Sequence, residues 1–302
     1  MRTKKNLIFS NNLKDYYPKV LIKRKIEMKQ IISVLSIAGS DSCGGAGIEA
    51  DLKTISSLGL YACCAITAVT SQNTKQVKDI FAVPSNIVES QIDCVLEDFD
   101  VSAIKIGMIY NKDNVFAIKN SLLRNNFSKS IILDPVLVAT SGSNLATKEL
   151  LFSIKQELFP ISQLITPNLS EAEAIVGKKI KDIDSMIEAG KEIIKSYKAK
   201  NVLIKGGHLE NIDMTDVLVM NDMSVKMFNH KKINSNNTHG TGCTLSSAIA
   251  CFCCLNDNNI ETSVSKAKEY VTNAIDNSKE LNTGHGHGSL NHLFCPQKLI
   301  IK

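Results

Sequence analysis

The chain of 302 residues contains no tryptophan, and aromatic residues make up only 5% of it. Proteins that hold single-stranded nucleic acids commonly stack the bases on aromatic side chains, so this shortage argues against such a surface. Long apolar runs are missing too, because none approaches the roughly 18–20 residues that a membrane-spanning helix needs. We therefore expect neither a nucleic acid nor a membrane as a partner.

Basic residues are abundant at only one end of the chain. The formal net charge is +5, but residues 1–28 hold eight lysines and arginines against two acidic residues. This segment alone carries +6, which leaves −1 for everything after it. We predict a basic, disordered N-terminal extension over residues 1–28 and a catalytic domain over residues 29–302. We favour a disordered tail, or an upstream reading of a protein that begins at Met28, over an organelle-targeting peptide.

The nine cysteines are odd in number and irregularly spaced. Cys63 and Cys64 lie in a strand-like apolar run, and Cys251, Cys253 and Cys254 lie in a helix-like one. This pattern is typical of buried free thiols in a reducing compartment rather than of a disulfide framework. We expect a cytoplasmic protein.

Two familiar phosphate-binding signatures are missing. The chain has neither the G-x-G-x-x-G pattern of dinucleotide sites nor the G-x-x-x-x-G-K-[ST] loop of P-loop kinases. Instead, an apolar helical run follows Thr238-His239-Gly240-Thr241-Gly242-Cys243-Thr244. Glycines let backbone N–H groups turn toward one point, and a helix N-terminus adds a positive dipole end. The segment predicts a phosphate site, the alternative being an ordinary helix start capped by Thr241.

Short β-rich runs alternate with helical segments from residue 31 onward. This alternation predicts one α/β domain of three layers, with helices on both faces of a mostly parallel sheet. The expected strands are residues 31–38, 62–70, 103–107, 130–134, 163–166, 201–205, 214–220 and 224–230, the last two as a hairpin. The expected helices are residues 47–58, 85–99, 114–125, 148–158, 171–176, 185–198, 244–255 and 262–281.

Polar residues follow six of these expected strands at their carboxyl ends. They are Gly39–Asp41, Gln72–Asn73, Lys105–Met108, Asp134, Asn168 and Lys205–His208. Ligands of parallel α/β sheets gather beyond the carboxyl ends of the strands. The common placement of these residues therefore predicts one site at this edge of the sheet.

The glycine-rich residues 38–47 join the first expected strand to the first expected helix. They form either a plain tight turn or a loop whose backbone approaches a small ligand. Asp51 lies one turn into that helix, where we expect it to accept a hydrogen bond from a substrate hydroxyl. The alternative for Asp51 is an ordinary exposed helix carboxylate.

Asn168 and Glu171 lie three residues apart near a predicted helix start. Helix capping explains them, with Ser170 as the cap and Glu171 in the first turn. Alternatively they hold Mg²⁺ through water and share the ion with Asp134, because Mg²⁺ keeps several waters and needs few carboxylates. Lys205 would then neutralise phosphate charge.

Three histidines, His285, His287 and His292, lie in or after a glycine-rich stretch near the C-terminus. They lack the carboxylate and thiolate companions and the spacing of a zinc site. We interpret the stretch as a flexible loop that borders the pocket.

Taken in this order, the motifs resemble those of the ribokinase superfamily and, more narrowly, of the hydroxymethylpyrimidine/phosphomethylpyrimidine kinases of thiamine synthesis. The resemblance covers about residues 30–294. The matching stretches are residues 37–41, 44–54, 72–74, 105–108, 134–136, 166–172, 205–208 and 237–246.

The resemblance implies a role for each candidate residue. Gln72 would read the edge of an aminopyrimidine, since a carboxamide donates and accepts hydrogen bonds at once. The other implied substrate-binding residues are Gly39, Asp51 and Met108. The implied ATP-binding residues are Asn168, Lys205, Asp216 and Thr238, and the implied Mg²⁺ ligands are Asp134 and Glu171. The implied catalytic residues are Gly240, Thr241, Gly242 and Cys243.

Many relatives in the superfamily carry aspartate where Cys243 stands, whereas the pyrimidine-kinase branch resembles this chain in having cysteine. A helix N-terminus can lower the thiol pKa from about 8.5, so we expect Cys243 to receive the hydroxyl proton. A loose phosphoryl-transfer transition state asks little of its base. We therefore rank the backbone anion site above proton abstraction.

The implied reaction is ATP-dependent phosphorylation of 4-amino-5-hydroxymethyl-2-methylpyrimidine, followed by conversion of the monophosphate into the diphosphate. The nearest alternative is a pyridoxine or pyridoxal kinase on the same scaffold, because both rings carry a hydroxymethyl arm. A catalytically silent nucleotide or vitamin sensor is a second alternative. The resemblance also implies a homodimer.

Overall fold

Continuously apolar strands form the centre of the fold. Strands β1 (Ser33–Asp41), β4 (Val101–Ile106) and β5 (Ser130–Leu133) are buried along nearly their whole lengths. Strands that are hidden on both faces require a layer of helices on each side of the sheet. The structure, a computed structural model, describes residues 29–137, 147–206 and 214–301. The predicted extension over residues 1–28, and Gly207 and His208 of the sixth strand-end motif, lie outside these ranges.

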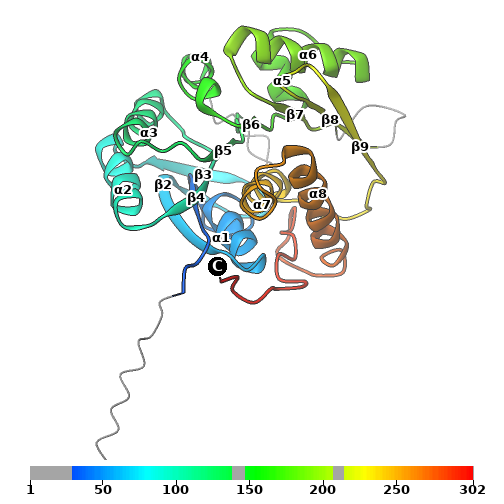
Figure 1. Ribbon diagram of the computed structural model, residues 1–302. Helices are drawn as coiled ribbons and strands as arrows, with labels where there is room; N and C mark the ends of the chain where they lie inside the picture. The colour runs from blue at the N-terminus through cyan, green and yellow to red at the C-terminus, as the bar shows by residue number, and fades with distance from the viewer. Residues whose placement is uncertain (1–28, 138–146, 207–213, 302) are drawn as a thin grey trace, which may run out of the picture. The chain divides into compact units, whose positions relative to one another are not determined.

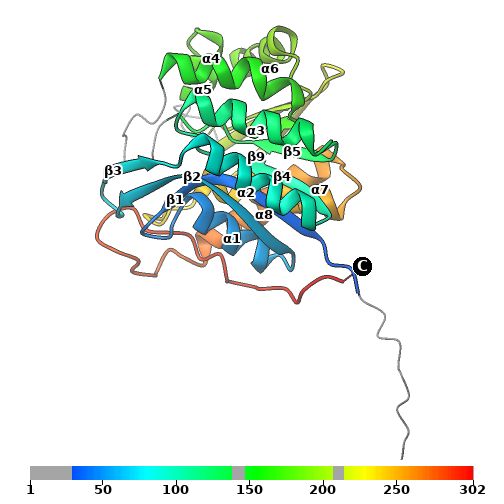
Figure 2. The same cartoon turned by 90° about the vertical axis from the view of Figure 1, so that its left-hand side faces the viewer.

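Within the described ranges, nine strands form one sheet (Figures 1 and 2). The other six are β2 (Tyr61–Gln72), β3 (Val77–Ala82), β6 (Leu164–Ile165), β7 (Val202–Ile204), β8 (Met214–Val219) and β9 (Val225–His230). Their order is β3-β2-β1-β4-β5-β6-β7-β8-β9, and the six from β2 to β7 in this order run parallel. The mostly parallel sheet is confirmed, as is the hairpin of β8 and β9.

Helices cover both faces of this sheet, which confirms the three-layer α/β/α prediction (Figure 1). One layer comprises α2 (Ser85–Asp98), α3 (Lys112–Arg124), α4 (Lys148–Glu157), α5 (Leu169–Val176) and α6 (Ile183–Tyr197). The other comprises α1 (Gly47–Ser57), α7 (Thr241–Leu255) and α8 (Ile260–Asp276). Strand β1 packs against both helix layers. Leu35 lies in the hydrophobic core under the first layer, and Val34, which points to the opposite face, lies in the core under the second.

One strand of the sheet escaped the sequence analysis. Strand β3 pairs antiparallel with β2 at the sheet edge, where Val69 lies opposite Phe81. All six of its residues are partly or fully exposed, so it lacks the continuous apolar run that marks the central strands. In the described part of the chain, no helix is long and apolar enough to cross a membrane.

The parallel strands position the site because their carboxyl ends meet at one edge. Strand β1 runs into the glycine-rich turn before α1, and β4 and β5 end just before Gly107 and Asp134. The N-termini of α5 and α7 reach the same edge, since residues of both line one cavity there.

Candidate active site

A cavity of about 1210 Å³ lies at the carboxyl ends of the parallel strands. It gathers nearly all of the residues singled out from the sequence. Those that line it are Gly39, Gln72, Met108, Asp134, Asn168, Glu171, Lys205, Asp216, Thr238, Gly240, Thr241, Gly242 and Cys243. Asp51 is the exception. The strand-end pattern therefore located the cavity.

The turn into α7 is held by close contact between two glycine-rich segments. Gly240 has a φ of 85°, and a Cβ there would lie 1.9 Å from the carbonyl oxygen of Gly45. Gly240, not Thr241, is the N-cap of α7, and the Thr241 hydroxyl donates to the Thr238 carbonyl at 2.7 Å. The alternative of a Thr241 cap is therefore wrong. The first-turn N–H groups of a helix lack intrahelical acceptors, so those of Gly242 and Cys243 are available to an anion.

Lys205 and Asp134 form an ion pair beside this turn. The Lys205 Nζ lies 2.9 Å from Asp134 Oδ1, which also accepts the Thr166 hydroxyl at 3.1 Å. A Cβ on Gly242 would lie 3.3 Å from the Lys205 Nζ and 3.4 Å from Asp134 Oδ2. An anion bound at the α7 N-terminus would therefore have an ammonium group as its neighbour.

Asn168 and Glu171 form a reciprocal capping box at the start of α5. The Asn168 side chain accepts from the Glu171 N–H at 2.9 Å, and Glu171 Oε2 accepts from the Asn168 N–H at 2.8 Å. The cap is thus Asn168, which corrects the assignment of Ser170. Helix capping by these two residues is confirmed. The same two residues also line the cavity.

The Glu171 carboxyl is buried, and its pKa is raised to about 7. Burial is the main cause and the nearby Asp134 adds to it, while Lys205 acts in the opposite direction. Glu171 therefore binds a proton more readily than an ordinary carboxyl, and a cation bound beside it would take the place of that proton. Carboxylate oxygens with room for water are the ligands that Mg²⁺ prefers, so Asp134 and Glu171 fit a magnesium ion.

The Cys243 side chain is in the protonated thiol form near neutral pH. Burial raises its pKa to about 11, although Lys105 and the Gly47 N–H favour the thiolate. The expected lowering of the pKa by the helix N-terminus is therefore wrong for this structure, because the loss of solvation outweighs it. This result agrees with ranking the backbone anion site above the thiol.

Asp51 lies in the protein core instead of the cavity. Its carboxylate pairs with Lys105 at 2.7 Å, and it also accepts the hydroxyls of Ser36 at 2.5 Å and Ser247 at 2.7 Å. Neither Asp51 nor Lys105 is exposed to solvent. Full burial contradicts the alternative of an exposed helix carboxylate, whereas the expected hydrogen bond to a substrate hydroxyl stays a prediction. Its role is to join β1, β4 and α7 to α1.

The proposed substrate end of the cavity contains Gly39, Met108 and Gln72. A Cβ on Gly39 would lie 3.3 Å from the thioether of Met108, so glycine leaves room there. Among the described residues, the side-chain amide of Gln72 makes only long contacts, 3.4 Å from the Thr70 hydroxyl and 3.3 Å from His239 Nε2. Its polar atoms are therefore able to exchange these contacts for a ligand.

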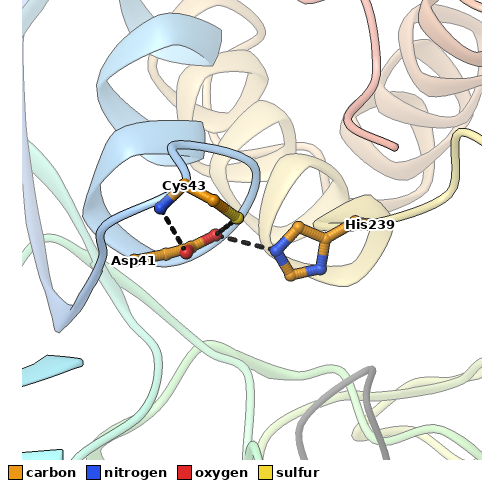
Figure 3. A group of neighbouring side chains, drawn as sticks. All are labelled: Asp41, Cys43 and His239. Carbon is orange, nitrogen blue, oxygen red and sulfur yellow. Dashed lines mark hydrogen bonds and ion pairs between the residues drawn. The ribbon is translucent and has the colours of Figure 1, made fainter. Parts of the chain in front are cut away.

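Three further cavity residues were not assigned a role from the sequence. His239 Nε2 lies 2.7 Å from Asp41 Oδ2 (Figure 3). Burial opposes ionisation of Asp41, but hydrogen bonds from His239 and Cys43 outweigh it and lower the Asp41 pKa to about 2. Lys268 of α8 pairs with Asp216, whose other oxygen accepts the Gly206 N–H at 2.9 Å. The position of His239 inside the glycine-rich motif was a usable signal, whereas Lys268 in mid-helix gave none.

The C-terminal histidines occupy two kinds of environment. His285 and His287 are exposed, and of the described residues none between 283 and 289 lines the cavity. His292 is buried, and its Nε2 lies 2.9 Å from the Thr244 hydroxyl of α7. The loop lies next to His239, which forms an isolated bridge with Ser289.

Known proteins resemble this chain along most of its length. A kinase named hydroxymethylpyrimidine/phosphomethylpyrimidine kinase from Rhizobium meliloti is 43% identical over 85% of this chain and 96% of that protein. A thiamine biosynthesis bifunctional protein from Geobacter sulfurreducens is 42% identical over 88% of this chain, which spans 53% of that longer protein.

Solved structures of two kinases also resemble this chain along most of its length. The crystal structure of phosphomethylpyrimidine kinase from Clostridium difficile 630 has a TM-score of 0.71 and 40% identity, covering 81% of this chain and 99% of that one. The pyridoxal kinase from Staphylococcus aureus in complex with AMP-PCP and pyridoxal has a TM-score of 0.77 and 28% identity, covering 87% and 94%. Residues 41–291 match the family model described as Phosphomethylpyrimidine kinase, and the chain belongs to that family of phosphotransferases.

Proposed function

We propose that this chain uses ATP to phosphorylate 4-amino-5-hydroxymethyl-2-methylpyrimidine, and then its monophosphate, in thiamine biosynthesis. The observation that carries the proposal is the meeting of three features in one cavity. These are the glycine turn of α7, the Lys205–Asp134 pair beside it, and the Gln72 amide. The membership of the phosphomethylpyrimidine kinase family supports the same reaction.

ATP would supply the phosphoryl group, and Mg²⁺ would neutralise part of the phosphate charge. In this proposal Asp134 and Glu171 hold the magnesium ion. Lys205 attracts the terminal phosphate, and the backbone N–H groups of residues 240–243 stabilise the charge that develops on it. The nucleotide side of the cavity is assigned to Asn168, Asp216 and Thr238.

On the substrate side, Gln72 donates to and accepts from the pyrimidine edge, while Gly39 and Met108 shape the space for the ring. Cys243 receives the hydroxyl proton, and because burial raises its pKa to about 11 it must first release its own proton to water in the cavity that it lines. We therefore assign the larger share of the rate enhancement to the α7 turn and Lys205.

We also propose a homodimer and a cytoplasmic location. The exposed pair of Val69 and Phe81 at the sheet edge offers apolar surface that a second copy can cover. Leaving Cys254 aside, the other eight cysteines are free thiols, which fits a reducing compartment. Sedimentation velocity of the purified chain tests the dimer, and a monomer at micromolar concentration would contradict it.

A competition assay tests the function. The purified chain, MgATP and a coupled ADP-release readout are combined with the pyrimidine alcohol, with pyridoxal, or with both, and the products are identified by mass spectrometry. We expect a kcat/KM at least about tenfold higher for the pyrimidine, about 1.4 kcal/mol of discrimination. Pyridoxal kinase is the second candidate, favoured by the structural likeness to the Staphylococcus aureus enzyme, and a preference for pyridoxal would establish it. Tight binding without turnover would indicate a sensor instead.

A further inference from the structure

Three side chains of different chemistry converge at the rim of the cavity. Figure 3 shows Asp41 between Cys43 and His239, which come from the β1–α1 turn and the segment before α7. Asp41 Oδ2 lies 2.7 Å from His239 Nε2 and 3.3 Å from Cys43 Sγ. One carboxylate oxygen, one sulfur and one imidazole nitrogen thus lie within 4.8 Å of one another.

The surrounding backbone holds two of these donors in place. Asp41 accepts N–H groups from Cys43 at 3.0 Å, Gly45 at 3.1 Å and Ala46 at 2.9 Å. A Cβ on Gly45 would lie 2.3 Å from the His239 ring, so the ring packs directly on this glycine. Cys43 is exposed, so its side chain has room to rotate once the sulfur releases its contact with Asp41, and one side of the cluster is open to water.

Carboxylate, thiolate and imidazole together are typical ligands of a borderline-soft divalent ion. Tetrahedral zinc, with bonds of about 2.0–2.3 Å, would place such donors about 3.3–3.6 Å apart. The carboxylate-to-sulfur distance already has this value, and the carboxylate-to-nitrogen distance must widen by about 0.6 Å. Rotation of the exposed Cys43 side chain and a small shift of His239 bring the three donors into range.

We propose that Asp41, Cys43 and His239 bind one Zn²⁺ or Co²⁺ ion, with water as the fourth ligand, and that this ion reversibly inhibits the enzyme. Binding breaks the Cys43 S–H bond and releases that proton to solvent. His239 binds through Nε2 and carries its proton on Nδ1, and Asp41 contributes an ionised oxygen. The backbone N–H groups that now orient Asp41 remain as its supports.

Inhibition follows from the position of the cluster. Asp41 and His239 line the cavity, and the Gln72 amide lies 3.3 Å from the nitrogen that would bind the ion. His239 directly precedes Gly240, the N-cap of the α7 turn. An ion here would displace the Gln72 contact and pull on that turn. The inhibition rests on the proposed kinase activity, whereas the binding of the ion does not.

Cobalt spectroscopy of the full chain tests the binding. Co²⁺ is added alone to reduced, metal-free protein, and the near-ultraviolet thiolate-to-cobalt absorption is recorded alongside equilibrium dialysis with Zn²⁺. We expect one ion per chain and a charge-transfer band. Cys43→Ser should abolish the band and weaken Zn²⁺ binding at least tenfold. The matched control Cys295→Ser, at another exposed cysteine, should retain both.

The double variant His285→Ala/His287→Ala separates this site from the exposed histidines of the C-terminal loop. It should bind like the wild type. No ion bound to the wild type, or binding that survives Cys43→Ser and disappears in the histidine variant, would overturn the site.

A kinase assay tests the inhibition. One equivalent of Zn²⁺ should lower the turnover of the wild type at least tenfold, and a zinc-selective chelator that spares Mg²⁺ should restore it. Cys43→Ser should keep its full activity in the presence of zinc. Equal inhibition of the wild type and Cys43→Ser would overturn the inhibitory role. A chain without kinase activity that still shows the Cys43-dependent band would contradict only the proposed function.

Discussion

Among the described residues, two of the buried lysine–aspartate pairs differ in what surrounds them. In the pair of Lys105 and Asp51 neither side chain is exposed, and the carboxylate also accepts two serine hydroxyls. In the pair of Lys205 and Asp134 the lysine side chain is 17% exposed, and both residues line the cavity. The same two residue types therefore form a closed structural link in one place and an open site in the other.

The difference teaches how to separate a structural charge from a functional one. A charge buried among protein partners has no room for a ligand, and its removal leaves the partner charge uncompensated. A charge at a cavity wall keeps hydrogen-bonding capacity that a phosphate can use. The following predictions test this distinction, beginning with the space that Gly242 leaves open next to Lys205.

Gly242→Val should lower kcat at least about 1000-fold, a loss of about 4 kcal/mol of transition-state stabilisation. The new side chain would occupy the space within 3.4 Å of Lys205 and Asp134, where the phosphate is expected. Gly240→Val should be equally inactive, because its Cβ would clash with the Gly45 carbonyl. Steady-state ADP release measures both.

Cys243→Ser is the companion of these glycine variants. It should retain measurable activity, lower by about tenfold, because the thiol is mostly protonated and contributes less than the backbone anion site. If Cys243→Ser and the two glycine variants lose activity to the same extent, the ranking of these contributions is contradicted.

Lys105→Met should destabilise the fold by about 3–5 kcal/mol, since it leaves Asp51 as an unpaired buried charge. Urea unfolding followed by circular dichroism measures the free energy of unfolding. Adding Asp51→Leu should recover much of the loss, because apolar side chains of similar volume replace buried ion pairs well. If Lys105→Met alone is as stable as the wild type, this pair is not a structural link.

Lys205→Met should show the opposite profile. We expect kcat to fall about 100- to 1000-fold, about 2.7–4 kcal/mol. The urea midpoint should change little, because both residues line the cavity and the space that the ammonium group leaves admits water to the Asp134 carboxylate. Lys205→Arg, which keeps the charge, is the control and should retain part of the activity. A loss of stability as large as that of Lys105→Met would remove the distinction between the two pairs.

The smallest effect concerns Glu171 and pH. Burial raises its folded-state pKa to about 7, above the 4.5 of an ordinary glutamate. The stability that its proton contributes is therefore fully present below about pH 4.5 and is lost as pH rises through about 7. Glu171→Gln, neutral at every pH, should therefore raise the Tm at pH 8 and raise it less at pH 5. Thermal unfolding without Mg²⁺ measures this, and equal changes at both pH values would contradict the raised pKa.

The sequence predicted the central strands and the edge of the sheet where the cavity lies, because burial on both faces demands continuous apolar runs. It could not predict the environment of Asp51. The partners of Asp51 stand 15, 54 and 196 residues away along the chain, so only the tertiary fold brings them together.

Three features of the helices could not be predicted from the sequence either. Whether Asn168 or Ser170 caps α5 depends on backbone angles near the terminus. The pKa of Cys243 depends on how deeply α7 buries the thiol, and the position of Lys268 next to Asp216 depends on how α8 packs. None of these follows from residue spacing alone.

A crystal structure with a non-hydrolysable ATP analogue, Mg²⁺ and the pyrimidine alcohol tests the central claim most directly. We predict the terminal phosphate within hydrogen-bonding distance of the backbone N–H groups of Gly242 and Cys243 and of the Lys205 Nζ, with the pyrimidine edge on Gln72. A terminal phosphate bound elsewhere, with the α7 turn and Lys205 contacting neither ligand, would contradict it.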